Sequence, residues 1–483
     1  MLGEQAVDDE ENEEENEEGG MDGVDDSKKN RVDEFIAHPK KAVWKLAVPV
    51  MLGMAVQTAY SITDMIFIGQ LGSDAIAALT FNMPLGFFSI GITFGLGVGA
   101  TSAIARLLGA KNKEGANNAA SHALLVGMLA GFIIPALGLL FKERIFTALG
   151  VPPNVLEGAL VYFSIIAPSF VFSNLNVQFR SILTGEGDTR TPIAFQIGGT
   201  LLNLVLDPLL IFTAGWGIAG AAWATLISQA AVFLVFFYYF FIRKGTYLEP
   251  PVRSFVYSWT VVKQILQIGF PASLSMVVMS VGGMFFNRLV SLFGSDAVAA
   301  FGIGGRLDSV YFLPNFALAS SMVTLTGMFY GAGRIDLIRQ TVYYVFLRGQ
   351  FLALGFGVIF YFFSPQIFSI FTDDKAILDI AISYIRTVVF AFPFITVGVI
   401  SGRVFQGLGE GVPSLLLTAM RVILVSGALA SLFVHVLDMG LESIWLALAL
   451  GAGITSTVSL GWILVRLNRL EREVEVVSEK AHA

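Results

Sequence analysis

Two aspartates lie inside long apolar stretches of this 483-residue chain. Asp64 stands in an apolar run that begins at Val48, and Asp207 lies in the segment QIGGTLLNLVLDPLLIF. A carboxylate at the centre of a bilayer costs roughly 2.5–3.5 kcal/mol on insertion scales, so such a residue normally faces a polar cavity that has a function. Both aspartates are therefore candidates for binding a proton or a metal cation.

Polar residues recur at helical spacing around each aspartate. Gln57, Tyr60 or Ser61, and Asp64 share one helix face, and a second stripe consists of Gln196, Thr200, Asn203 and Asp207. Carboxylate, amide and hydroxyl oxygens are hard cation ligands, and they can also relay protons. A purely structural alternative is that these groups only make hydrogen bonds between helices.

Two prolines accompany the aspartates. Pro208 has no backbone N–H, so it deprives the carbonyl of Leu204 of its usual helical partner. Pro49 permits a bend in the helix that carries Asp64. We also expect Thr225 and Ser228 of the sixth predicted span to add hydroxyls to this group.

The composition indicates which elements position these residues. Hydrophobic residues make up 55% of the chain and charged residues 14%, whereas a soluble domain carries roughly 25% charged residues. The apolar blocks are about 20 residues long, enough to cross a ~30 Å hydrocarbon core as a helix. We predict an all-α membrane protein with twelve spans, at 43–68, 77–104, 118–141, 155–180, 191–213, 218–242, 263–292, 299–326, 340–363, 377–403, 412–435 and 441–465.

The two halves of the chain are related by an internal repeat. LGSDAIAAL at 71–79 recurs as FGSDAVAAF at 293–301, and the same offset in numbering, 222, pairs Tyr162 with Tyr384. Each half has an even number of predicted spans, so both halves enter the membrane in the same direction. The sequence thus predicts two six-helix lobes related by a parallel, pseudo-two-fold repeat.

This repeat divides the chain into five parts. They are an acidic cytoplasmic tail with a juxtamembrane segment (1–39), an N-terminal lobe (40–242), a cytoplasmic linker (243–262), a C-terminal lobe (263–466) and a cytoplasmic tail (467–483). We expect the run VDDEENEEENEEGGMDGVDD to be disordered, because like charges cannot bury apolar surface.

Basic residues give the predicted orientation. They gather before the first span and after the even-numbered spans, with Lys142, Arg144 and Lys375 as exceptions. By the positive-inside rule, both termini of a multi-pass plasma-membrane protein then lie in the cytoplasm.

Several kinds of site are excluded by the residues that are missing. The chain has no cysteine and therefore no disulfide or thiolate metal site, and its four histidines lack metal-ligand spacing. No Gly-Lys dipeptide occurs, so there is no P-loop. We expect no cofactor beyond a coupling ion, no nucleic-acid partner and no enzymatic activity. The glycines Gly91, Gly95 and Gly99 are expected to pack helices together.

The second half lacks the acidic pair. The offset maps Asp64 onto Phe286 and Asp207 onto Leu429. Its own polar candidates are Arg306 and Asp308, each of which we expect to join an ion pair.

Over residues 40–465 the chain resembles the multidrug and toxic compound extrusion (MATE) family, and most closely its DinF-like and archaeal branch. The resemblance rests on VPVMLGMAVQTAYSITDMIFIGQLGSDAIAAL, GAKNKEGANNA, RSILTGEGDTRTP, LNLVLDPLLIF and GIAGAAWATLIS. It implies two lobes around a V-shaped cavity. It also implies export of amphipathic, often cationic compounds in exchange for H+ or Na+.

The resemblance also implies roles for single residues. The cation site of that branch matches Asp64, Asn203, Asp207 and Thr225. Residues that line the cavity or couple it to the ion match Pro49, Gln57 and Tyr60. Thr200, on the stripe that contains Asn203 and Asp207, is a further candidate. The branch also has an asparagine in span 4, for which Asn174 or Asn176 is the match. The NorM-like branch instead uses acids of the C-terminal lobe, including one in span 7, where this chain has GGMFFNRLV.

Some alternatives stay open at this point. A lipid or lipid-linked oligosaccharide flippase of the same superfamily is the second hypothesis, because Arg306, Arg403 and Arg421 lie in or near predicted spans. An intramembrane enzyme is a third, although no nucleophile accompanies the aspartates. The sequence does not separate H+ from Na+. The expected partners are small-molecule substrates and membrane lipid, and the expected state is a monomer.

Overall fold

The computed structural model of this chain describes the backbone of residues 31–250 and 255–482, and side chains up to residue 473. Within these ranges it is all helical, with no strand. Twelve helical segments there are long and apolar enough to cross a membrane, which confirms the predicted number of spans. The predicted disordered run lies outside the described residues.

The first six spans follow a short helix, α2 (Val32–Ala37). They are α3 (Pro39–Gly69), α4 (Ser73–Gly109), α5 (Lys113–Ala148), α6 (Pro153–Gly185), α7 (Arg190–Pro208) continued by the π-helix η3 (Leu209–Thr213), and α8 (Gly217–Phe237) continued by η4 (Tyr238–Ile242). The helices run past the predicted spans because helical hydrogen bonding continues into the polar ends of each segment.

The other six spans repeat this order. They are α9 (Trp259–Val290) with η5 (Ser291–Phe293), α10 (Ser295–Gly331), α11 (Ile335–Phe368), α12 (Lys375–Val388) joined through η6 (Val389–Ala391) to α13 (Phe392–Leu408), α14 (Gly411–Ala419) joined through η7 (Met420–Val425) to α15 (Ser426–His435), and α16 (Glu442–His482).

The repeat is visible in the turns between helices. Gly72 precedes α4 and Gly294 precedes α10, with φ of 99° and 103°. Both angles lie in the region that disfavours any residue with a Cβ atom. The two glycines are counterparts in the repeat, so the duplicated motif GSDA folds into the same turn in both lobes.

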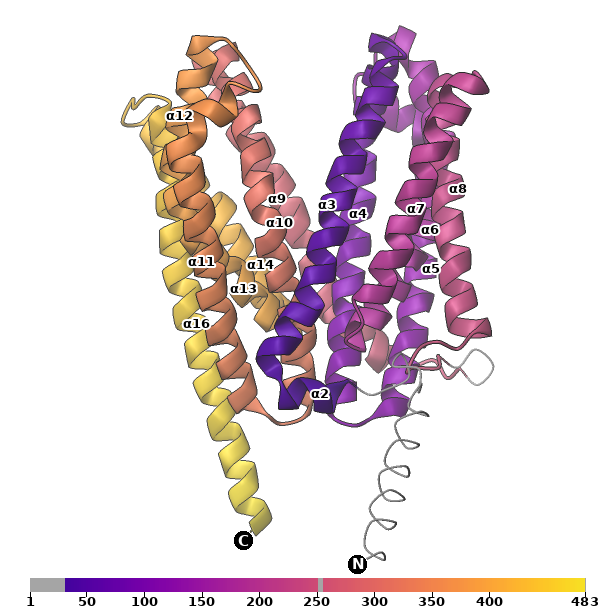
Figure 1. Cartoon of the computed structure of the whole chain (residues 1–483), viewed down its shortest axis with the longest axis vertical. Coiled ribbons are helices and arrows are strands. Elements are labelled where there is room, and N and C mark those ends of the chain that lie inside the picture. The colour runs from indigo at the N-terminus through magenta and orange to yellow at the C-terminus, as the bar shows by residue number, and fades with distance from the viewer. Residues whose placement is uncertain (1–30, 251–254, 483) are drawn as a thin grey trace, which may run out of the picture.

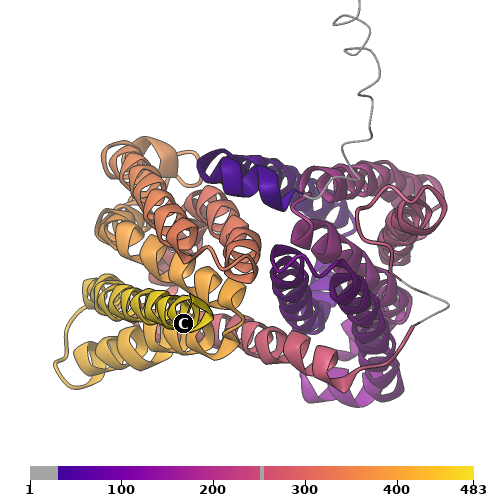
Figure 2. The ribbon, with the colours of Figure 1, turned by 90° about the horizontal axis from the view of Figure 1, so that it is seen from below.

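The spans form two bundles that lie side by side. In Figure 1, α3 to α8 make one bundle and α9 to α16 the other, and the ribbons of the two bundles diverge away from the end where α2 and the last turns of α16 lie. We call this end the terminus side. The first helix of each lobe packs on the second helix of the other, α9 on α4 and α3 on α10, and Figure 2 shows this junction from the terminus side.

The apolar core joins the lobes only toward the terminus side. The largest buried cluster contains residues of both lobes there, among them Phe35, Ala105, Phe179, Met328 and Phe405. The next two clusters each belong to one lobe, around Tyr311 and Trp445 in the second and around Phe146 and Phe163 in the first. The two bundles are therefore held together at one end and separate at the other.

The predicted glycine contacts contribute to this junction. A Cβ atom on Gly95 would lie 2.3 Å from the Gly269 carbonyl oxygen, and one on Gly99 would lie 2.2 Å from that of Ile265. Real Cβ atoms essentially never approach within 3.0 Å. The close approach of α4 and α9 thus depends on glycine, as predicted.

Candidate functional site

Polar side chains of α3 and α7 meet inside the N-terminal lobe. The Tyr60 hydroxyl donates a hydrogen bond to Asn203 Oδ1, and Asn203 Nδ2 donates to Asp207 Oδ1 at 3.3 Å. Tyr60 and Asn203 are 143 residues apart in sequence, so their contact depends on how α3 packs on α7. The stripe predicted on α7 is thus half of a network between two helices.

Asp64 joins this network through Asp207. The two carboxyl groups lie within hydrogen-bonding range of each other. Asp207 is fully buried, and its Oδ2 has no hydrogen-bond partner among the described residues. Within the described ranges, neither carboxyl forms an ion pair with Lys or Arg. Two carboxylates this close repel when both are ionised, so a shared proton or a bound cation would complete the pair.

Thr225 and Tyr162 border the network of Tyr60 and the acidic pair from two further helices. Thr225 Oγ1 on α8 donates to the Ala221 carbonyl at 3.1 Å and lies within hydrogen-bonding range of Tyr60. Tyr162 on α6 is close enough to interact electrostatically with both aspartates. In the sequence, Tyr162 stands out only as the repeat partner of Tyr384. No pattern in the sequence places it beside the aspartates.

Other predicted residues lie away from the pair. Thr200 is buried one turn before Asn203 on α7. Gln57 is exposed, two turns before Asp64. Pro49 lies within an unbroken α3, fifteen residues before Asp64 or roughly 22 Å along a helix. Thr200 and Gln57 therefore lie one to two turns from the network, and Pro49 lies further away on the helix that carries Asp64.

The two candidate asparagines of α6 bond elsewhere. Asn174 Oδ1 accepts a hydrogen bond of 2.7 Å from Thr93 on α4. Asn176 Nδ2 donates to Gln229 Oε1 on α8 at 3.1 Å. Both lie at least twelve residues beyond Tyr162, so they link α6 to its neighbours about three turns away from the aspartates.

The backbone is irregular directly after Asp207. Helix α7 ends at Pro208, and the five-residue π-helix η3 follows. Pro208 has no N–H to donate, so the ordinary helical pattern cannot pass through it unchanged. Short π-helical segments are rare and occur frequently at functional sites.

The C-terminal lobe holds a different acidic contact. The Tyr384 hydroxyl donates to Asp308 Oδ2 at 2.5 Å, while Asp308 Oδ1 is buried without a partner in the described part of the chain. The expected ion pairs are wrong: Arg306 is exposed, and neither it nor Asp308 has an oppositely charged group within 4 Å there. Asp308 is bonded instead by Tyr384, whose hydroxyl reaches the carboxylate from α12. The Arg306 side chain is exposed and forms no ion pair with Asp308.

The side-chain atoms available as ligands limit which ions the N-terminal site can bind. Among the described residues, no cluster of three or more His, Cys, Asp or Glu side chains could hold a metal ion. A cation would rely on Asp64 and Asp207 together with the neutral oxygens of Asn203 and Thr225. Such an all-oxygen set suits a hard cation, and the same pair can bind a proton.

A two-lobed bundle of twelve spans built from an internal repeat is an architecture found among membrane transporters. The MatE family model matches the chain twice, at residues 49–209 and 271–431. Both the starts and the ends of these two ranges differ by the offset of the internal repeat. The chain belongs to the MATE family of multidrug transporters, and its members are transporters and not enzymes.

Individual relatives cover most of the chain. The probable multidrug resistance protein YoeA of Bacillus subtilis is 30% identical over 353 residues, which are 71% of this chain and 76% of the relative. The probable multidrug resistance protein NorM of Thermotoga maritima is 26% identical over 446 residues, covering 89% of this chain and 93% of the relative. The solved structure of a MOP superfamily transporter from Pyrococcus furiosus is similar with a TM-score of 0.85 and 32% identity, covering 90% of this chain and 97% of that one.

Proposed function

We propose that this transporter is a secondary active antiporter, which exports amphipathic or cationic organic compounds in exchange for H+ or Na+. The observation that carries this proposal is the contact between Asp64 and Asp207, a pair of carboxyls without a basic partner in the described chain. Because such a pair requires a proton or a cation, its occupancy would change with the ion gradient. The cation site therefore consists of Asp64 and Asp207, with Asn203 and Thr225.

A cavity next to the pair is a suitable place for part of a substrate. Its volume is about 240 Å³, and α4 and α6 line it with Asn82, Met83, Phe87, Tyr162 and Phe170 among others. Asn82 Oδ1 is buried there without a described partner. Aromatic and aliphatic walls with a few polar groups are typical of sites for small organic molecules. Tyr162 borders both this cavity and the aspartates, so it connects substrate and ion.

The proposed cycle is rocker-type alternating access. An ion from the open side neutralises or binds between Asp64 and Asp207. The change in charge alters the packing of α3, which carries Pro49, and displaces the substrate from the N-terminal lobe. The lobes then separate on the terminus side, and the ion leaves.

Further properties belong to this proposal. We place the protein in the plasma membrane with both termini in the cytoplasm, as a monomer surrounded by lipid and in the DinF-like and archaeal branch of the family. The flippase alternative gains no support from YoeA and NorM, the two relatives reported above that are named for multidrug resistance.

Transport by proteoliposomes under an imposed pH or sodium gradient tests the proposal. Asp64→Asn and Asp207→Asn keep the size of each side chain but remove its charge. We expect each variant to lose ion-driven substrate movement. Asp308→Asn is the matched control, since it makes the same change to a half-buried aspartate in the other lobe. Intact coupling in both N-lobe variants, or loss of coupling in Asp308→Asn alone, would contradict the proposed site.

A further inference from the structure

The two lobes contact each other on the terminus side through two equivalent sets of residues. Ser102 Oγ on α4 donates a hydrogen bond of 2.6 Å to the Gln406 carbonyl oxygen at the end of α13. Thr324 Oγ1 on α10 donates one of 3.0 Å to the Thr184 carbonyl oxygen at the end of α6. The repeat offset maps Ser102 onto Thr324 and Thr184 onto Gln406. The two hydrogen bonds are therefore counterparts, each joining the second span of one lobe to the fourth span of the other.

Two glycines repeat the same relation seven residues further along these helices. A Cβ atom on Gly109 would lie 2.0 Å from the Met328 carbonyl oxygen, and one on Gly331 would lie 2.0 Å from that of Arg106. Gly109 and Gly331 are counterparts in the repeat, as are Arg106 and Met328. Any larger residue would force its Cβ atom against the backbone of the partner helix, so α4 and α10 can cross this closely only through glycine.

The loops that follow α6 and α13 are also matched. Gly187, after α6, has φ of 87° and would place a Cβ atom 2.6 Å from the Phe35 ring. Gly409, after α13, has φ of 93° and would place one 2.5 Å from Arg106 Nη1. Each loop thus needs a left-handed glycine and packs closely against its neighbours.

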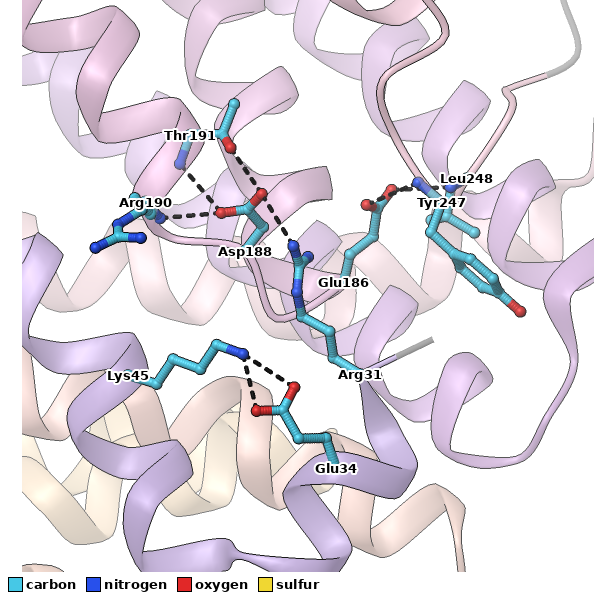
Figure 3. Close-up of polar contacts among 9 residues, drawn as sticks. All are labelled: Arg31, Glu34, Lys45, Glu186, Asp188, Arg190, Thr191, Tyr247 and Leu248. Atoms are coloured by element: carbon cyan, nitrogen blue, oxygen red, sulfur yellow. Dashed lines mark hydrogen bonds and ion pairs between the residues drawn. The ribbon is translucent and has the colours of Figure 1, made fainter. Parts of the chain in front are cut away.

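Each of the two loops forms an ion pair with one arginine, which comes from near the start of the chain for one loop and from near its end for the other. Asp188 accepts from Arg31 Nη2 at 3.4 Å, as Figure 3 shows, and its counterpart Glu410 pairs with Arg466 at 2.6 Å. Arg31 directly precedes α2, and Arg466 lies on α16. Both ends of the chain therefore help to fix the loops in the closed arrangement.

We propose that these contacts form a gate with two equivalent halves, in which Ser102 and Gly109 make one half and Thr324 and Gly331 the other. The gate holds the lobes together on the terminus side, and both halves separate when that side opens. Its residues contact neither the acidic pair nor the N-lobe cavity. They are positioning residues, which set the balance between the two states of the transporter.

This inference rests on the proposed alternating access, but its test needs neither substrate nor ion gradient. The chain has no cysteine, so Glu114→Cys and Asp336→Cys supply the only two thiols for spin labels. Both positions are exposed beside the gate, one in each lobe, and they are counterparts in the repeat. Double electron–electron resonance in nanodiscs then reports the distance between the labels, and thus the fraction of molecules open on the terminus side.

We expect Ser102→Ala and Thr324→Ala each to raise the ratio of open to closed molecules about fivefold, the effect of losing one hydrogen bond worth about 1 kcal/mol. Because the halves are equivalent, the two shifts should agree within about twofold. Gly109→Ala and Gly331→Ala should each shift the ratio at least as far. The alanine variants at Ser102 and Thr324 add no bulk, so they keep the test valid if a glycine variant fails to fold.

Gly305→Ala on α10 is the matched control, since an added Cβ there would meet no atom within 4 Å. We expect it to leave the distance distribution unchanged. The proposal is overturned if Ser102→Ala and Thr324→Ala behave like this control, or if only one of them shifts the ratio. Failure of ion coupling in the transport assay would leave this result unaffected, so the two proposals can fail separately.

Discussion

Tyr60 is the residue that joins α3 to the polar stripe of α7. Its hydroxyl donates to Asn203 Oδ1, and Asn203 in turn donates to Asp207. Tyr60→Phe removes this donor and leaves a buried amide oxygen unpaired, which costs about 1–3 kcal/mol. We expect the apparent affinity for the coupling ion to fall about fivefold or more. The ion concentration that gives half-maximal substrate efflux from proteoliposomes measures this effect.

Tyr384→Phe is the control for that experiment, because it removes a tyrosine hydroxyl beside an aspartate in the other lobe. We expect it to leave the ion dependence of efflux unchanged. Equal effects of the two substitutions would mean that the network around Asn203 has no special part in ion binding.

Glu186 is a buried acid on the terminus side that has no part in the proposed transport cycle. Its carboxylate accepts from the backbone N–H groups of Tyr247 at 3.3 Å and Leu248 at 3.1 Å (Figure 3). Burial raises the pKa of Glu186 from about 4.5 to about 8, although these two donors and the nearby Arg31 oppose the shift and Asp188 adds to it. Between these two pH values the folded state therefore binds more protons than the unfolded state. Stability falls as pH rises through this window.

Glu186→Gln removes that titration, so we expect its thermal stability to depend less on pH between about 4.5 and 8. Thermal unfolding of the purified protein in detergent at a series of pH values checks this. Glu249→Gln, at an exposed acid in the linker that carries Tyr247 and Leu248, should follow the original curve. A Glu186→Gln curve that runs parallel to the original one would show that Glu186 does not titrate in this range.

How far the site could be predicted depends on the range of each interaction. Asp64, Asn203 and Asp207 stood out because a carboxylate or amide in an apolar span is costly wherever it lies. The hydrogen bond from Tyr60 to Asn203 and the place of Tyr162 depend on how helices distant in sequence pack. The bonds of Asn174 to Thr93 and of Asn176 to Gln229 were not predictable for the same reason.

At the scale of helices, the contact between α4 and α9 depends on glycines that differ in how closely they approach the partner. An added Cβ would lie 2.2 Å from the Ile265 carbonyl oxygen at Gly99, but at Gly91 it would meet only Met276 Cβ at 3.7 Å. We expect Gly99→Ala to destabilise the protein by about 1–3 kcal/mol through overpacking. Gly91→Ala should change stability by less than about 0.5 kcal/mol.

Thermal unfolding in detergent distinguishes these two variants of one helix. Since both replace glycine by alanine in a helix, the change in helix propensity is the same and only the packing differs. Similar melting temperatures for the two variants would show that α4 and α9 can move apart at little cost.

The number and order of the helices followed from the sequence, whereas their ends did not. Hydropathy locates apolar segments because each span must match the thickness of the hydrocarbon core. It does not locate helix ends such as Ser73 of α4 or Lys113 of α5, which depend on turns and caps. The Asn112 side chain, for example, accepts a hydrogen bond from the Gly115 N–H at 2.7 Å to begin α5.

At the scale of the whole molecule, duplication gave the two lobes the same scaffold and different chemistry. The glycine turns and the gate contacts recur at equivalent positions of the repeat, because both lobes need them to pack. The pair of Asp64 and Asp207 has no counterpart, since Phe286 and Leu429 occupy the equivalent positions. A tyrosine beside an acid is nevertheless present in both lobes, through Tyr162 and Tyr384.

The orientation proposed from the distribution of charge can be tested directly. Basic residues cluster on the terminus side, which the positive-inside rule places in the cytoplasm. Glu114 lies exposed on that side, after α4, and Asp373 lies exposed on the opposite side, between α11 and α12. Because the chain has no cysteine, a single cysteine at either position is the only thiol in the protein.

We expect a membrane-impermeant maleimide to label Asp373→Cys in intact cells and to label Glu114→Cys only after the membrane is permeabilised. Both substitutions replace an exposed acid, so the thiols differ mainly in the side of the membrane that they face. The opposite labelling pattern would place the termini outside. The lobes would then be open toward the cytoplasm in this structure, and the proposed direction of the transport cycle would have to be reversed.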